Sequence, residues 1–130
     1  MTLLDQLISE LPAGMDRELL RILSFHQGRD NAIGRGRLLI ELARMGFHLD
    51  ERQMRAEINK LRKEGNLICS CGGNQGGYFA PANPRELEDY FAHELHPRAM
   101  DLLEQEHAMK DAAEKLWGRY APERQGSLFG

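Results

Sequence analysis

The hydrophobic pattern of this chain changes its period at Gly65, and that change limits the folds that it can adopt. Before Gly65, the apolar residues Met54, Ile58 and Leu61 are four and three positions apart, which places them on one face of a helix. After Gly65, residues 67–71 (LICSC) are short and mostly apolar, which is typical of a strand. The segment therefore contains a helix followed directly by extended chain.

A second strand follows after a glycine-rich segment. Residues 72–77 (GGNQGG) contain four glycines, which allow the chain to reverse, and residues 78–80 (YFA) return as a strand. The two strands form a predicted β-hairpin. The preceding helix is expected to begin at a capping box, in which Asp50 accepts from first-turn amides and Gln53 reaches back, and to end near Glu64.

Three more helices are predicted before this one. The first spans residues 3–11, and the second is expected to start with Asp16 as its N-cap. Residues 28–34 form a turn region that contains a short extended piece at residues 31–33, and the third helix spans residues 35–45 and stops at Gly46. Their apolar residues are Leu3, Leu4, Leu7, Ile8 and Leu11, then Leu19, Leu20, Leu23 and Phe25, then Leu38, Leu39, Leu42 and Met45.

A long helix is predicted after the hairpin. Asn83 is a suitable N-cap, the proline after it fits the first helical position, and Glu86 completes a capping box. The helix is expected to reach Trp117 and to bend or break at Pro97. Its apolar residues follow a near-heptad pattern, with Glu106 in the remaining seam position, which favours self-association into a homodimer. The alternative is that this helix packs on the N-terminal helix of residues 3–11 within one chain. The apolar members of this seam are Leu95, Ala99, Leu102, Met109, Ala113 and Leu116.

The order of predicted elements in residues 16–80 is helix, helix, tight turn, helix and β-hairpin, which is the order of a winged helix-turn-helix. The predicted fold class is therefore mainly α with a small β-hairpin, a winged helix-turn-helix plus a long C-terminal helix. The predicted parts are an N-terminal helical arm (1–15), a winged-helix domain (16–82), a C-terminal helix that can dimerise (83–118) and a flexible tail (119–130).

Charge is distributed unevenly along the chain, whose formal net charge is −3. Residues 1–16 carry three acids and no base, residues 17–80 carry eleven bases and seven acids, and residues 81–130 carry six bases and ten acids. A middle segment with a net charge of +4 between acidic ends indicates an anionic partner for the middle alone.

The helix from residue 50 has a polar face opposite its apolar face. An α-helix fits the major groove of DNA, which is about 12 Å wide, and Arg and Asn can make bidentate hydrogen bonds to base edges. The alternative is an ordinary solvated face, because residues 50–64 carry four acids and a net charge of only +1. The element order and the positive middle segment favour DNA. The candidate DNA-binding residues are Arg35, Arg37, Arg52, Gln53, Arg55, Asn59 and Lys63.

Three sequence blocks resemble a family of small winged-helix proteins common in bacteriophages and prophages. They are residues 55–65 (RAEINKLRKEG), the LICS that follows, and residues 76–90 (GGYFAPANPRELEDY). The same pattern is similar to the N-terminal domain of the biotin repressor, whose ligase portion has no counterpart here. The resemblance covers about residues 16–92 and implies binding of double-stranded DNA through the helix from Asp50. The hairpin tip departs from the pattern, because it contains no Lys or Arg.

A second resemblance lies in residues 125–129 (QGSLF), which are similar to the peptide that docks on the bacterial replication sliding clamp. Leu128 and Phe129 would be its apolar anchors, and Gln125 would offer an amide to a polar pocket beside them. The alternative is that Leu128 and Phe129 fold back onto the C-terminal helix. The candidate clamp-binding residues are Gln125, Leu128 and Phe129.

The sequence indicates no catalytic site, so we expect neither an enzyme nor a cofactor. Cys69 and Cys71 share one side of a strand, but a zinc site needs four ligands, and we interpret them as small core side chains. His93 and His96 are interpreted as solvated or locally packed residues rather than as metal ligands. The cysteine usage and the lack of a signal segment or apolar span predict a cytoplasmic protein that does not bind membranes.

Two functions of different classes follow. The first is a DNA-binding protein, either a phage-type transcription regulator or a DNA replication or recombination accessory that the sliding clamp recruits. The second is a protein–protein interaction or oligomerisation module without DNA binding. Salt-dependent binding to duplex DNA separates the two.

Overall fold

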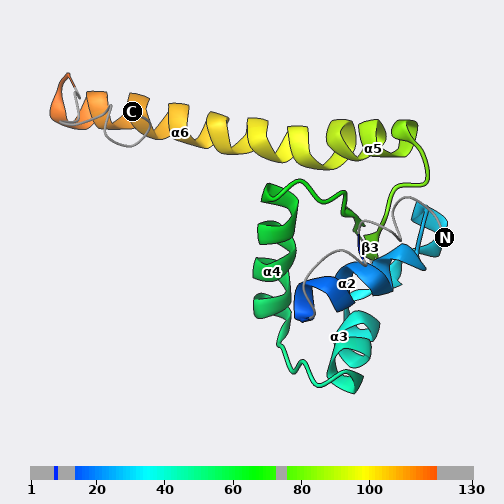
Figure 1. Ribbon diagram of the computed structural model, residues 1–130. Coiled ribbons are helices and arrows are strands. Elements are labelled where there is room, and N and C mark those ends of the chain that lie inside the picture. Colours follow the sequence, from blue (N-terminus) through cyan, green and yellow to red (C-terminus); the bar gives the residue numbers. More distant parts are fainter. Residues whose placement is uncertain (1–7, 9–13, 73–75, 120–130) are drawn as a thin grey trace. The chain divides into compact units, whose positions relative to one another are not determined.

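The computed structural model describes residue 8 and residues 14–72 and 76–119, which form mainly helices and one small antiparallel sheet (Figure 1). The predicted mainly helical fold with a small hairpin and a long C-terminal helix is confirmed. The chain divides into two units, residues 1–91 and residues 92–130. The elements are α2 (Met15–Ser24), the 3-10 helix η1 (Arg29–Asn31), β1 (Ile33–Gly34), α3 (Arg35–Arg44), α4 (Glu51–Lys63), β2 (Cys69–Cys71), β3 (Gly77–Phe79), α5 (Pro84–Tyr90), the π-helix η2 (Phe91–Leu95) and α6 (His96–Trp117).

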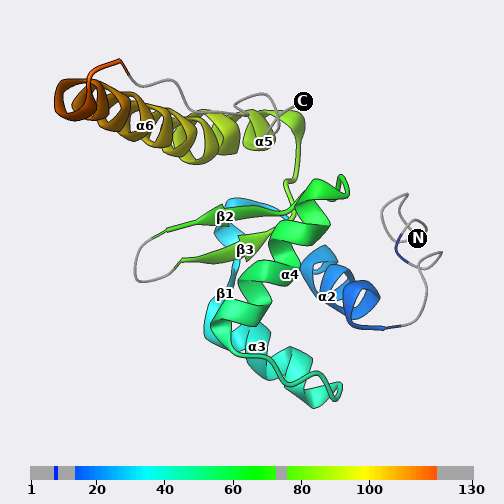
Figure 2. The ribbon, with the colours of Figure 1, turned by 90° about the vertical axis from the view of Figure 1, so that its left-hand side faces the viewer.

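The first unit is built around an apolar core between α2, α3 and α4 (Figures 1 and 2). Ile8 is helical and buried in the same core, whereas the rest of the predicted first helix lies outside the described residues. Removing these side chains from water supplies most of the stability of such a unit. The three helices contribute Leu19, Leu20, Ile22 and Leu23, then Leu38 and Leu42, then Met54, Ile58 and Leu61.

Helix α2 begins differently from the prediction. Its N-cap is Gly14, and no side chain caps it. Asp16 lies inside the first turn, where the helix dipole favours an acid, and its carboxylate accepts a hydrogen bond from Lys60 Nζ at 3.2 Å. Phe25, counted among the apolar residues of this helix, lies just beyond it as the C-cap residue and is 79% exposed.

Glycines end α3 and α4, as the sequence predicts. Gly46 and Gly65 have φ angles of 93° and 98°, in the left-handed region that glycine adopts without steric cost. The last helical residue of α3 is Arg44, so Met45 was wrongly placed in the helix, and its side chain is exposed.

The sheet has three strands in the order β1-β3-β2, all antiparallel (Figure 2). The predicted hairpin is present as β2 and β3, although β2 begins at Cys69 and leaves Leu67 exposed. Residues 33 and 34 form β1, so the extended piece predicted at residues 31–33 begins too early, because Asn31 belongs to η1. This strand pairs Ile33 with Tyr78 and Gly34 with Gly77, a long-range pairing that local sequence does not encode.

A smaller core cluster lies under the other side of the hairpin. It contains Cys69, Cys71, Phe79 and Tyr90, with Leu87 packed against it. Both cysteines are therefore core side chains, as interpreted from their spacing. Burial raises the pKa of the Cys69 thiol to about 11.

Helix α5 is capped by Asn83, whose Oδ1 accepts from the Glu86 amide at 2.9 Å, as predicted. The expected capping box is wrong, because Glu86 does not return to Asn83. Its Oε1 accepts from the Ala82 amide at 2.9 Å, and its Oε2 accepts from the Arg29 amide at 3.1 Å. Glu86 thus joins α5 to η1.

The second unit consists mainly of α6. The helix predicted from residue 84 to residue 117, with a bend or break at Pro97, is interrupted by the π-helical turn Phe91–Leu95, which ends two residues before Pro97. A proline in a helix interior removes a hydrogen bond and crowds the preceding turn, and a wider π turn accommodates it. No residue of α6 is buried.

Within the described residues, no helix is long and apolar enough to cross a membrane.

Gly77 provides a test of the sheet. A Cβ at this position would overlap the carbonyl of Ile33 on β1. We expect Gly77→Ala to destabilise the protein by about 1–3 kcal/mol, as other overpacked core positions do. Gly72→Ala is the matched control, because a Cβ there meets nothing within 4 Å. Urea unfolding of the two variants measures the difference, and equal stabilities would contradict the close approach of β1 to β3.

Candidate nucleic-acid interface

A capping box fixes the start of α4. Asp50 Oδ1 accepts from the Gln53 amide at 2.7 Å, and Gln53 Oε1 accepts from the Asp50 amide at 3.0 Å, as predicted. Such a box satisfies two amides that a helix start otherwise leaves without partners. The Gln53 oxygen is therefore engaged in the helix itself, which leaves only its amide NH₂ group for a ligand.

One side of α4 is buried and the other is polar. Met54, Ile58 and Leu61 are at most 2% exposed. The opposite side carries four exposed residues at steps of three, four and four, and we call them the α4 stripe: Arg52, Arg55, Asn59 and Lys63. With about 3.6 residues per turn, this spacing keeps all four on one line along the helix.

The α4 stripe contains three bases and no acid, because the acids of α4 lie beside it. Glu51 and Glu57 occupy the flanks between the stripe and the buried side. In the part of the chain that the structure describes, the four stripe side chains make neither an ion pair nor a hydrogen bond. The net charge of +1 calculated for residues 50–64 therefore understates how basic the outward line is.

The two other candidate residues lie on α3. Arg35 is half-buried at its start, and Arg37 Nε donates to Glu41 Oε1 at 3.0 Å. Arg44 Nη1 reaches the same carboxylate oxygen at 3.1 Å. Arg37 is thus partly neutralised within its own helix, and an anion would have to compete with Glu41 for it.

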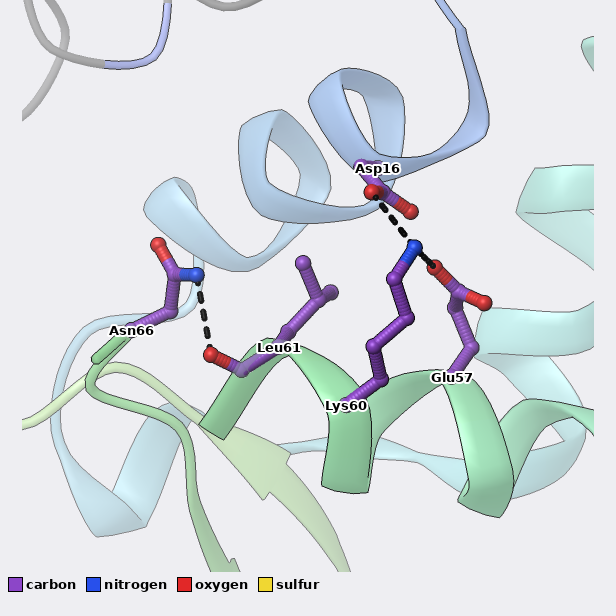
Figure 3. A network of polar contacts seen from close by, with 5 residues as sticks. All are labelled: Asp16, Glu57, Lys60, Leu61 and Asn66. Atoms are coloured by element: carbon purple, nitrogen blue, oxygen red, sulfur yellow. Dashed lines mark hydrogen bonds and ion pairs between the residues drawn. The ribbon is translucent and has the colours of Figure 1, made fainter. Parts of the chain in front are cut away.

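Lys60 belongs to α4 but not to the stripe. Its ammonium binds Asp16 Oδ2 on α2 at 3.2 Å and Glu57 Oε1 at 3.4 Å (Figure 3). A hydrogen bond with Glu57 lowers the pKa of Asp16, opposed by burial and assisted by Lys60. The hydrogen bond with Asp16, burial and the negative charge of Asp16 raise the pKa of Glu57. Lys60 therefore ties α4 to α2.

Two side chains, neither of them among the candidate residues, hold the C-terminal end of α4. Asn66 Nδ2 donates to the Leu61 carbonyl at 2.9 Å (Figure 3), and Arg62 Nε donates to the Ile68 carbonyl at 2.8 Å. The Arg62 guanidinium also lies over the rings of Tyr78 and Tyr90, at 5.9 and 5.5 Å. Arg62 follows the buried Leu61 at the edge of the apolar face, and this position was the available signal.

The remaining predicted features either lie outside the described residues or show no group of side chains that could bind a metal ion. The middle of the hairpin tip (73–75) and the clamp-like residues Gln125, Leu128 and Phe129 fall outside the described ranges. Among the residues that are described, no group of His, Cys, Asp and Glu could hold a metal ion. The α4 stripe is therefore the candidate site.

Comparison of the chain with protein-family models, with curated proteins and with solved structures finds no match.

The contact between Glu57 and Asp16 predicts a specific pH dependence. Because the pKa of Glu57 is raised in the folded state, the folded chain keeps a proton on Glu57 at pH values where the unfolded chain has released it. The stability that this protonation contributes therefore falls as pH rises from the ordinary glutamate pKa to the raised one. Glu57→Gln does not titrate, and its amide can still donate to Asp16. We expect the stability of the variant, relative to the parent, to increase as pH rises above 4.5, the ordinary pKa of a glutamate.

Urea unfolding at several pH values measures this difference. Glu64→Gln is the matched control, since it removes the same charge from an exposed residue just beyond α4. If the stability of Glu57→Gln relative to the parent stays constant or falls as pH rises, Glu57 does not hold a proton in the folded state in the way proposed here.

Proposed function

We propose that residues 16–82 form a winged-helix domain that binds double-stranded DNA, with α4 as its recognition helix. The protein would act as a phage- or prophage-type regulator or as an accessory in DNA replication or recombination. The observation that carries the proposal is the acid-free α4 stripe opposite a fully buried face.

The order of elements supports the proposal. Helix α2, strand β1, helices α3 and α4 and the β2–β3 hairpin follow one another as a helix-turn-helix with a wing would. Strand β1 lies between the first two helices and pairs with β3, so the hairpin is attached to the helical part by backbone pairing as well as by packing.

The chemistry of the α4 stripe suits a base-reading helix. Arg52 and Arg55 offer guanidinium forks that match the N7 and O6 acceptors of guanine, and Asn59 offers an amide that matches adenine. Lys63, one turn after Asn59, suits a phosphate as a point charge. A helix whose opposite side is buried can enter the groove without exposing its apolar residues.

Replacing both stripe arginines tests the proposal. A base-reading arginine contributes about 1–3 kcal/mol, so Arg52→Ala/Arg55→Ala should weaken duplex binding at least about tenfold. Lys63→Ala, which removes the phosphate contact, should instead reduce the salt slope of log K by about one. Fluorescence titration of a labelled duplex at two salt concentrations measures both quantities.

The matched control is Lys115→Ala/Arg119→Ala, which removes two positive charges from the exposed surface of the second unit. Its affinity should stay close to that of the parent. Equal loss in the two double variants would mean that only net charge matters. Failure of the parent to bind any duplex would instead favour the protein–protein interaction module.

We also propose that residues 125–129 recruit the protein to the bacterial sliding clamp. The support is the QGSLF sequence, in which Leu128 and Phe129 are apolar anchors and Gln125 offers a polar contact. Burying an apolar side chain of this size contributes about 1.5–3 kcal/mol, and ordering a short peptide offsets part of that. The expected dissociation constant is on the order of micromolar.

Calorimetric titration of a purified bacterial sliding clamp with the full chain tests this second partner. Leu128→Ala/Phe129→Ala should remove the binding, whereas Glu123→Ala/Arg124→Ala, just outside the motif, should preserve it. If the full chain shows no heat of binding, or if both variants behave alike, the motif is accidental.

A further inference from the structure

Helix α6 carries a regular line of exposed apolar residues. Leu95, which directly precedes α6, and Leu102, Met109 and Leu116 within it follow one another at intervals of seven and are 37–73% exposed. Small residues, Ala99 and Ala113, and Glu106 occupy the positions between them, and we call all seven residues the α6 seam. A helix of 22 residues is about 33 Å long, and helices in water gain most of their stability from packing such a face.

We propose that α6 pairs with α6 of a second copy of this chain as an antiparallel coiled coil, in which Glu106 lies opposite the partner's Met109. This inference goes beyond DNA binding and does not depend on it.

A parallel pair would place identical seam residues opposite each other. The central layer would then hold two Glu106 carboxylates, which repel one another where water is excluded. The other layers would contain either two alanines or two large residues. The large residues would hold the helices apart and leave gaps at the alanine layers. The composition of the α6 seam therefore disfavours the parallel pair.

An antiparallel pair removes both problems, because it sets the large seam positions against the small or charged ones, and we propose the register of this kind that overlaps most of α6. Each small or charged seam residue then meets a large apolar one: Ala99 meets the partner's Leu116, Leu102 meets the partner's Ala113, and Glu106 meets the partner's Met109. The summed size of the two side chains stays nearly constant along the helix. This uniform width is what close packing requires.

Glu106 brings its own counter-ion to the centre of the seam. Its Oε1 lies 2.8 Å from Lys110 Nζ one turn later, and both side chains are about half exposed. The carboxylate can stay at the edge with Lys110 while the methylene stem lies along the partner's methionine. The hydrogen bond from Lys110, with its positive charge, lowers the pKa of Glu106, so the group stays ionised at neutral pH.

The charge distribution of the second unit also favours the antiparallel orientation. Residues 92–106 carry four acids and one base, a net charge of −3, whereas residues 107–119 carry three bases and two acids, a net charge of +1. An antiparallel pair sets the acidic half against the basic half. A parallel pair would set −3 against −3, so electrostatic complementarity selects the same orientation as side-chain size.

The first experiment tests association of the full chain. Light scattering over a concentration range around micromolar should show a reversible change from one chain mass to two. Leu102→Lys should weaken association at least about tenfold, because it puts a charge into two layers of the seam. Met100→Lys, the same change at an exposed residue outside the seam, should have little effect. Trp117, the only tryptophan, adjoins Leu116, and its emission should shift to shorter wavelength on association.

The second experiment tests the orientation by oxidation of introduced cysteines. Leu102→Cys mixed with Ala113→Cys should form a disulfide, because these positions face each other in the proposed register. Ala113→Cys alone should link slowly, since its two copies would lie about 16 Å apart, well beyond disulfide reach. The native Cys69 and Cys71 are buried, and the parent chain measures their background.

Two outcomes would overturn the proposal. A single-chain mass at every concentration, or equal weakening by Leu102→Lys and Met100→Lys, would exclude pairing through the α6 seam. Faster linking of Ala113→Cys with itself than with Leu102→Cys would mean that the helices pair in parallel.

Discussion

The guanidinium of Arg62 connects the two core clusters of the first unit. Its hydrogen bond to the Ile68 carbonyl fixes the chain between α4 and β2, and its contact with Tyr78 reaches the central strand of the sheet. Its contact with Tyr90 reaches α5 in the smaller cluster. A half-buried cation between two aromatic rings is stabilised by about 1–2 kcal/mol, and its hydrogen bond offsets part of the desolvation cost. The buried face of α4 (Met54, Ile58 and Leu61) turns the α4 stripe outward, and the contacts of Arg62 hold the C-terminal end of the helix in that position.

Local determinants explain the parts of the fold that the sequence predicts correctly. The Asp50–Gln53 capping box, the Asn83 cap and the helix stops at Gly46 and Gly65 each depend on residues within a few positions of one another. The two caps that the sequence predicts wrongly depend on residues far apart in the chain. Asp16 is bound to Lys60, which is 44 residues away, and Glu86 is bound to the Arg29 amide, which is 57 residues away. In both cases, a side chain that could have capped its own helix instead binds a partner that is distant in sequence and that the fold brings within hydrogen-bonding distance.

The candidate site divides in the same way. Helical spacing alone separates the buried and exposed sides of α4, so Arg52, Arg55, Asn59 and Lys63 could be assigned to one face before the structure was known. Which cations are already engaged could not be assigned. The pairing of Arg37 with Glu41 follows from a four-residue spacing on one helix, but the binding of Lys60 to α2 requires the packing of two helices. Counting charges over a segment therefore gives a poorer description of an interface than sorting them by face and partner.

Because Cys69 is buried in the small sheet, the reactivity of its thiol reports whether the sheet is intact. With a pKa of about 11 and no exposed surface, this thiol is almost entirely protonated and out of reach of oxidants and alkylating reagents in the folded chain. It becomes reactive only when the hairpin separates from the cluster around it. The rate at which a thiol reagent modifies Cys69 is thus set by how often the sheet opens, and this rate measures local unfolding of the native chain.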